Sequence, residues 1–183
     1  SRTRTATASA STATVTSIVG QFGTCSSASQ TLIWKGAPIR CSRAAPLPPK
    51  AAATFFQLGT NVNNHPDTST LLAGSGFEVG SHTASNQTLT KLGPRGRATE
   101  ITDAVNALSK LTGRPTMLFR PPYGAHNERI DAMMAKQNLA MINWAADSND
   151  WQNRDAGKIT KAVSQYAATY TQPIIVLHDT YQA

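Results

Sequence analysis

Short apolar segments alternate with amphipathic stretches through most of the chain. The apolar segments are bounded by glycine, proline or polar residues, and they predict strands at 13–19, 54–58, 77–80, 117–119, 140–144 and 173–177. The amphipathic stretches predict helices at 67–75, 99–111, 127–137 and 156–169. Asp67 is the expected N-cap of the first helix, and Gly113 follows the end of the second. Because strands and helices alternate, we expect an α/β fold with a parallel sheet or barrel.

Polar and ionisable residues follow four of the predicted strands. They lie in the runs 80–85 (GSHTAS), 119–124 (FRPPYG), 147–151 (DSNDW) and 174–179 (IIVLHD). The carboxyl ends of parallel strands meet at one edge of a sheet, where α/β folds build their sites. We therefore expect His82, Arg120, Asp150 and His178 to gather at that edge.

Arg120, Pro121, Pro122, Tyr123 and Gly124 form the most distinctive of these runs. Two consecutive prolines set φ near −65° and remove two N–H donors, so the backbone after the strand is a preset turn. Such a turn can hold the Arg120 side chain and the Tyr123 N–H in fixed positions.

Composition narrows the class of protein without naming it. A chain of 183 residues with 40% hydrophobic content suits one domain, and we expect a low-complexity lead-in at 1–16 followed by a single domain at 17–183. The net charge of +7 comes from scattered basic residues, which argues against nucleic-acid binding. No apolar run is long enough to cross a bilayer. The first residues lack a signal-peptide pattern, so we expect that any secretion signal was removed or never present.

The two cysteines, Cys25 and Cys41, leave two alternatives open. A disulfide between them would add about 3 kcal/mol of stability and indicate an oxidising compartment. Two free thiols agree with the cysteine count nearly as well.

In this order, the four polar runs and the segment 53–59 (ATFFQLG) resemble the NodB-type polysaccharide deacetylases of carbohydrate esterase family four. The resemblance covers about residues 51–179. It implies a distorted, incomplete (β/α) barrel and a metal-dependent hydrolase that removes N- or O-acetyl groups from chitin, xylan or peptidoglycan. It further implies a divalent metal ion as cofactor, with zinc preferred over cobalt. The protein it implies is a secreted, extracellular monomer. The implied partner is an acetylated polysaccharide or oligosaccharide.

The resemblance also assigns roles to single residues. His178 matches the catalytic acid, Asp150 the carboxylate that orients and charges it, and Arg120 the arginine that positions the catalytic base. The Tyr123 backbone N–H matches an oxyanion donor, and His82 matches a metal ligand. Four further residues match substrate-binding positions of the family: Pro121, Trp151, Val176 and Leu177. The last three of them match residues that line the acetyl pocket.

The sequence departs from this family pattern at two metal-binding positions. Asn86 stands where a second histidine ligand is expected on the same helical face as His82, and Asn86-Gln87-Thr88 forms a glycosylation sequon. The family's first motif, with two aspartates, falls by spacing on the run 31–36 (TLIWKG), which has no carboxylate. Either the sequence of residues 26–52 contains an error, such as a shifted reading frame, or this segment has diverged from the family. The alternative function is that of a catalytically inactive, carbohydrate-binding relative. The chain stops soon after the last motif, so we expect the barrel to be truncated there.

Overall fold

The computed structural model describes residues 18–20, 31–34, 37–40, 53–75, 77–171 and 173–179. Cys25, Cys41, the lead-in at 1–16 and most of the stretch 26–52 lie outside the described residues, so the alternatives stated for them stay open. None of the helices in the described ranges is long and apolar enough to span a membrane.

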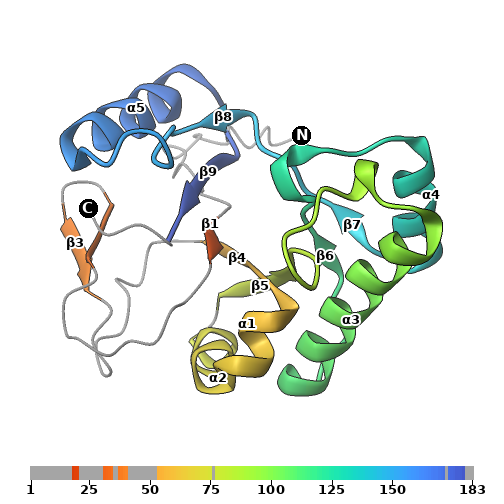
Figure 1. The fold of residues 1–183 in the computed structure, drawn as a ribbon. Coiled ribbons are helices and arrows are strands. Elements are labelled where there is room, and N and C mark those ends of the chain that lie inside the picture. The colour runs from red at the N-terminus through yellow and green to blue at the C-terminus, as the bar shows by residue number, and fades with distance from the viewer. Residues whose placement is uncertain are drawn as a thin grey trace, which may run out of the picture.

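A seven-stranded sheet runs through the centre of the fold (Figure 1). Its order is β7-β6-β5-β4-β1-β9-β8, and every pair of neighbours is parallel. The sheet is open within the described residues, as expected for an incomplete barrel. The strands are β1 (Ile18–Gly20), β4 (Thr54–Gln57), β5 (Glu78–Ser81), β6 (Leu118–Phe119), β7 (Ala140–Met141), β8 (Ala146–Asp147) and β9 (Ile175–His178).

Helices follow the strands in chain order. Figure 1 shows α1, α2 and α3 beneath the sheet, α4 beyond β7 and α5 beside β8 and β9. Local capping sets several of their ends: Gly113 ends α3 in the left-handed conformation (φ 67), and the Asn127 and Asp155 side chains cap α4 and α5. The helices are α1 (Gly59–Asn64), α2 (Pro66–Gly74), α3 (Pro94–Thr112), α4 (Glu128–Lys136) and α5 (Ala156–Thr169), with 3₁₀ turns at Leu89–Lys91 and Pro122–Gly124.

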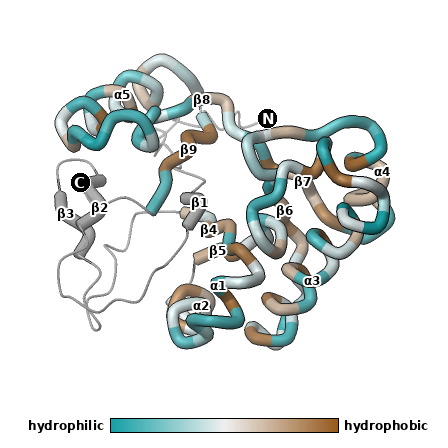
Figure 2. Tube along the Cα trace, in the orientation of Figure 1, coloured by the Kyte–Doolittle hydropathy of each residue, from teal (hydrophilic) through white to brown (hydrophobic). Residues whose placement is uncertain are grey.

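Neighbouring residues of β4 face opposite sides of the sheet. Phe55 packs with Leu72 beneath the sheet, whereas Phe56 packs with Val176 and Trp144 on the other side. A third cluster, built on Ile101 and Phe119, joins α3 and α4 to the sheet. Figure 2 shows brown and teal segments along the helices, with apolar colour over much of β9.

Four expectations about the elements need correction. The strand between β4 and β9 is Ile18–Gly20, whereas the run 31–34 forms β2 (Thr31–Trp34), which pairs antiparallel with β3 (Ala37–Arg40) outside the main sheet. Residues 142–144 lie between β7 and β8 and form no strand. Asp67 lies in the first turn of α2, where His65 occupies the N-cap position. Residues 82–88 form an irregular loop rather than a helix, so His82 and Asn86 share no helical face.

Candidate active site

The carboxyl edge of the sheet carries the ionisable residues predicted from sequence. His82 follows β5, Arg120 follows β6, Asp150 follows β8 and His178 ends β9. Backbone hydrogen bonds continue the strand ladders into this edge, from the His82 N–H to the Gln57 carbonyl and from the Arg120 N–H to the Ser81 carbonyl, both at 2.9 Å. These bonds tie the first residues of the loops after β5 and β6 to the sheet.

Asp150 and His178 form a directly bonded pair. The carboxylate accepts a hydrogen bond from the His178 backbone N–H at 2.5 Å and lies 2.8 Å from Nδ1 through its other oxygen. Asp150 is 5% exposed, while the His178 side chain keeps 27% of its surface accessible. A carboxylate can only accept, so the proton of this contact is carried by the Nδ1 atom of His178. This is the geometry of an oriented acid–base histidine.

His82 is held in a buried, neutral state. Its Nδ1 lies 2.8 Å from the Arg120 carbonyl oxygen, and since that oxygen can only accept, the lone pair resides on Nε2. Burial is the main reason why the pKa of His82 is lowered to about 4; the contact with the Arg120 carbonyl opposes this shift, and the charges of Arg120 and His178 add to it.

Arg120 is fully buried under the site. Its Nε donates to the Ile142 carbonyl at 2.9 Å, and its guanidinium carbon lies 4.3 Å from the Phe56 ring centre and 5.5 Å from the Trp144 ring centre. Burial lowers the pKa of Arg120 to about 9, so the group is still a cation at neutral pH. Two aromatic faces thus hold a permanent positive charge at the edge.

The turn after Arg120 has the rigid geometry that its sequence predicts. Pro121 and Pro122 are buried, Tyr123 has a positive φ of 61°, and its side chain is 69% exposed. A Cβ added at Gly124 would lie 3.3 Å from the Trp144 ring, so the ring packs closely against this backbone. Trp144 therefore contacts both Arg120 and the turn.

The apolar residues assigned to an acetyl pocket separate into two groups. Val176 packs with Phe56 and Trp144 on the Arg120 side of the sheet, and Trp151 is 46% exposed beside Asp150 in the chain. Leu177 instead packs with Phe55 and Leu72 on the opposite face. Successive strand residues point to opposite faces, so Leu177 and Val176 belong to different clusters, and the assignment of both to one acetyl pocket stays a prediction.

A zinc ion, as the resemblance implies, finds only part of its ligand set here. His82 suits the role, with a neutral Nε2 and an Nδ1 oriented by a carbonyl. Asn86 offers an amide, which binds zinc poorly. The described ranges contain no group of three or more His, Cys, Asp or Glu that could hold a metal, and residues 1–64 of the sequence contain no Asp, Glu or His. These residues do not fit a three-ligand zinc centre.

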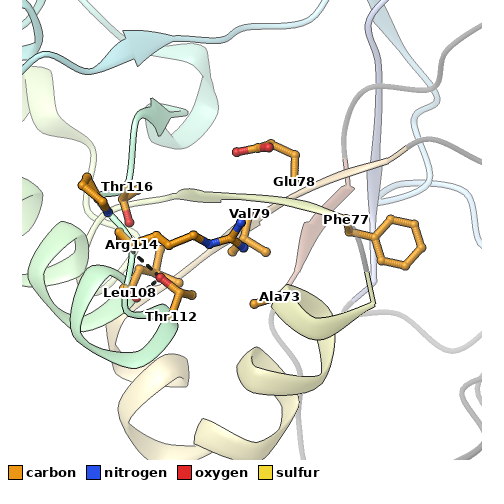
Figure 3. Close-up of a pocket in the computed structure, with 9 residues that line it drawn as sticks. Ala73, Phe77, Glu78, Val79, Leu108, Thr112, Arg114 and Thr116 are labelled. Carbon is orange, nitrogen blue, oxygen red and sulfur yellow. Dashed lines mark hydrogen bonds between the residues drawn. The ribbon is translucent and has the colours of Figure 1, made fainter.

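A separate pocket of about 230 Å³ lies at the opposite edge of the sheet (Figure 3). Glu78, the first residue of β5, and Arg114, after α3, line it together with the apolar Val79 and Leu108. The Thr112 hydroxyl lies 2.9 Å from the Leu108 carbonyl oxygen and 3.2 Å from that of Arg114. This pocket contains none of the predicted site residues, and the chemistry resides at the carboxyl edge.

Sequence analysis missed three residues that shape the site. Phe56 and Trp144 were assigned to strands, and nothing in their spacing indicates a contact with Arg120. Glu100 lies within a predicted helix, yet its carboxylate binds the loop that follows His82. Only the polarity of Glu100, on a helix whose neighbouring Ile101 is buried, would have marked it from sequence.

The chain is similar to proteins that are named as deacetylases. The family model described as polysaccharide deacetylase matches residues 49–142. The peptidoglycan-N-acetylmuramic acid deacetylase PdaC of Bacillus subtilis is 34% identical over 133 residues, which cover 73% of this chain and 27% of PdaC. A chitooligosaccharide deacetylase of Bradyrhizobium sp. is 32% identical over 135 residues, covering 72% of this chain and 60% of that protein.

A solved structure shows the same fold. The family 4 carbohydrate esterase of Streptomyces lividans, in complex with acetate, superposes with a TM-score of 0.66 at 30% identity, covering 72% of this chain and 67% of the esterase. The chain thus spans about a quarter of the length of PdaC and about two thirds of the esterase structure.

Proposed function

Because the chain belongs to the polysaccharide deacetylase family, we propose that it hydrolyses acetyl groups from an acetylated polysaccharide. The observation that carries this proposal is the Asp150–His178 pair, whose two short contacts orient an accessible imidazole at the carboxyl edge of the sheet. Amide hydrolysis needs an acid for the leaving nitrogen, and an oriented histidine is the side chain that most often supplies it.

Each residue of the edge has a distinct part in the proposed reaction. A water molecule adds to the acetyl carbonyl carbon, and the C–N bond of this adduct then breaks to give acetic acid and the free amine. As the bond breaks, the imidazolium of His178 donates its Nε2 proton to the leaving nitrogen, while Asp150 holds the Nδ1 proton in place. The Tyr123 backbone N–H stabilises the negative charge on the acetyl oxygen, and the buried Arg120 cation adds to the positive field at the site. Val176 and the partly exposed Trp151 contact the acetyl methyl and the sugar.

The substrate class follows from the relatives. Their names specify N-acetylated amino sugars of peptidoglycan and chitooligosaccharides, so we propose an N-acetylated glycan as substrate. Such substrates are extracellular, which supports a secreted protein, and we propose that the domain acts as a monomer.

The metal requirement stays a prediction. A divalent ion, when bound, would supply an activated water and polarise the acetyl carbonyl. Of the described residues, only His82 and Asn86 lie at the positions that match family ligands, and they do not complete a site.

The incomplete donor set favours a second candidate, a carbohydrate-binding relative without catalysis. In this case Asp150 and His178 would bind sugar hydroxyls, and Trp151 would stack on a sugar ring. The observation that supports this candidate is the incomplete set of metal ligands in the described part of the chain.

One experiment separates the two candidates. Acetate release from N-acetylated chitooligosaccharides and from peptidoglycan fragments is measured for the unmodified chain, with and without added zinc, and for His178→Ala. His126→Ala is the matched control, because His126 forms the same kind of contact with Asp131 but both side chains are exposed. We expect His178→Ala to reduce turnover about 10²- to 10⁴-fold and His126→Ala to leave it unchanged. Sugar binding without acetate release under any condition would instead identify the second candidate.

A further inference from the structure

The loop that carries His82 has a strained backbone. Thr83 has φ 69° and Asn86 has φ 65°, and neither is a glycine. Thr83 is β-branched and fully buried, a combination in which the left-handed conformation is a genuine outlier. Such a conformation persists only where the surroundings determine it. The groups that bind this loop therefore decide where His82 and position 86 lie.

The amino end of α1 binds the loop from one side. The Gly59 N–H donates to the Thr83 carbonyl at 3.0 Å, and the Thr60 N–H donates to the Ala84 carbonyl at 2.9 Å. A Cβ at Gly59 would lie 2.9 Å from the Ala104 Cα, so α1, the loop and α3 meet closely at this point. The Asn86 N–H also donates to the Thr83 hydroxyl at 3.1 Å, which closes the turn internally.

Glu100 of α3 binds the loop from the other side. Its carboxylate accepts from the Ser85 N–H at 2.8 Å and from the Ser85 hydroxyl at 2.5 Å, and its backbone carbonyl accepts from the Ala84 N–H at 2.8 Å. Two of the three bonds are made to a charged group and are the stronger for it. One residue of α3 thus satisfies three donors of two successive loop residues.

We propose that Glu100 is a positioning residue that holds the His82 loop in its strained form, an inference that rests on the proposed deacetylase function. The His82 ring bonds the Arg120 carbonyl, so a shift of the loop moves His82 relative to Arg120 and the Tyr123 turn. Without the carboxylate, Thr83 relaxes toward an ordinary conformation and the loop opens. Glu100 touches no substrate and acts only through Ala84 and Ser85.

The test compares Glu100→Ala, Glu100→Gln and Ser85→Ala with Asp103→Asn. Asp103 is exposed on the same helix, so its variant removes the same charge without touching the loop. Glutamine keeps one acceptor oxygen for Ser85 and should rescue partially, and Ser85→Ala removes a single bond if Glu100→Ala fails to fold. Hydrogen exchange of peptides spanning 82–88 is measured by mass spectrometry, together with kcat and KM on an N-acetylated chitooligosaccharide.

We expect Glu100→Ala to raise exchange across 82–88 about tenfold or more, with α4 and β6 unchanged. We expect kcat to fall about 10- to 100-fold, as for a small misplacement of a site group, with KM nearly constant. Unchanged exchange across 82–88 would show that Glu100 does not hold the loop. Raised exchange with unchanged kcat would overturn the positioning role. An unmodified chain that releases no acetate would overturn the proposed function, while the exchange result would still decide whether Glu100 holds the loop.

Discussion

Asp150→Asn tests the acid pair most directly, because it replaces a carboxylate by an amide of nearly the same size. Asp150 is 5% exposed, and its two oxygens contact the His178 backbone N–H at 2.5 Å and Nδ1 at 2.8 Å. In asparagine, one of those acceptors becomes an NH₂ group that cannot accept. The variant therefore keeps the shape of the site but leaves one His178 donor without its partner.

The magnitude follows from the bond that is lost. A hydrogen bond to a charged group contributes about 1.5–3 kcal/mol, so the free energy of unfolding should fall by about that amount. In a domain of this size each kcal/mol lowers the melting temperature by about 2–4 °C, which predicts a decrease of about 3–12 °C. Turnover should fall by about 10²- to 10⁴-fold, because a general acid without its orienting partner loses most of its effect.

The assay measures acetate release and thermal unfolding side by side for Asp150→Asn and Asp131→Asn. Asp131 bonds His126 Nδ1 at 2.9 Å, the same type of contact, but both side chains are about 40% exposed. The control should change stability by less than about 1 kcal/mol and leave turnover unaltered, because exposed pairs contribute little.

One outcome would refute this explanation of the pair. If Asp150→Asn loses stability as expected yet releases acetate at the unmodified rate, the bond to His178 is structural and the acid lies elsewhere. If both variants behave alike in both measurements, burial of Asp150 does not strengthen its contacts as we infer.

Three further predictions follow from the site and its packing. With one imidazole and one amide as ligands, the desalted protein should retain well below one zinc ion per chain, and a stoichiometric ion found by metal analysis would contradict that expectation. Because the pKa of His82 is about 4 when folded and 6.5 when unfolded, the unfolded state binds a proton that the folded state does not between these values. Stability should therefore fall by at most about 3 kcal/mol as pH drops from 6.5 to 4, and denaturant titrations should show a shallower fall for His82→Asn. Gly80→Ala should destabilise by about 1–3 kcal/mol, since its Cβ would lie 2.6 Å from the Phe56 ring, whereas Gly74→Ala has open space and should be neutral or stabilising by calorimetry.

The helices could be predicted from sequence because their signals are local. The helix expected at 156–169 is α5 (Ala156–Thr169), and the one expected at 99–111 lies within α3 (Pro94–Thr112) and ends before Gly113, as predicted. Apolar spacing and capping residues act over one or two turns, so they are visible without the rest of the fold. The strand β4 (Thr54–Gln57) was equally clear from its apolar run.

Strand partners were harder to predict because pairing depends on residues far apart in the chain. The place beside β9 belongs to Ile18–Gly20, not to the run 31–34, and residues 142–144 pass between two strands. A short apolar run satisfies the local requirements of a strand equally well at several places. Which run is used is decided by the neighbours that it meets.

The α/β class and the family could be inferred from the sequence alone, because the strand and helix patterns and the motif order are visible in it. The gathering of His82, Arg120, Asp150 and His178 at one edge could be inferred too, because residues that follow parallel strands end on the same side. Only the tertiary structure decided that Leu177 faces away from Val176, that Trp144 packs on Arg120, and that Glu100 holds the His82 loop. Those contacts join elements that lie far apart in the chain. Their geometry is set by how helices and sheet pack together, which no local pattern encodes.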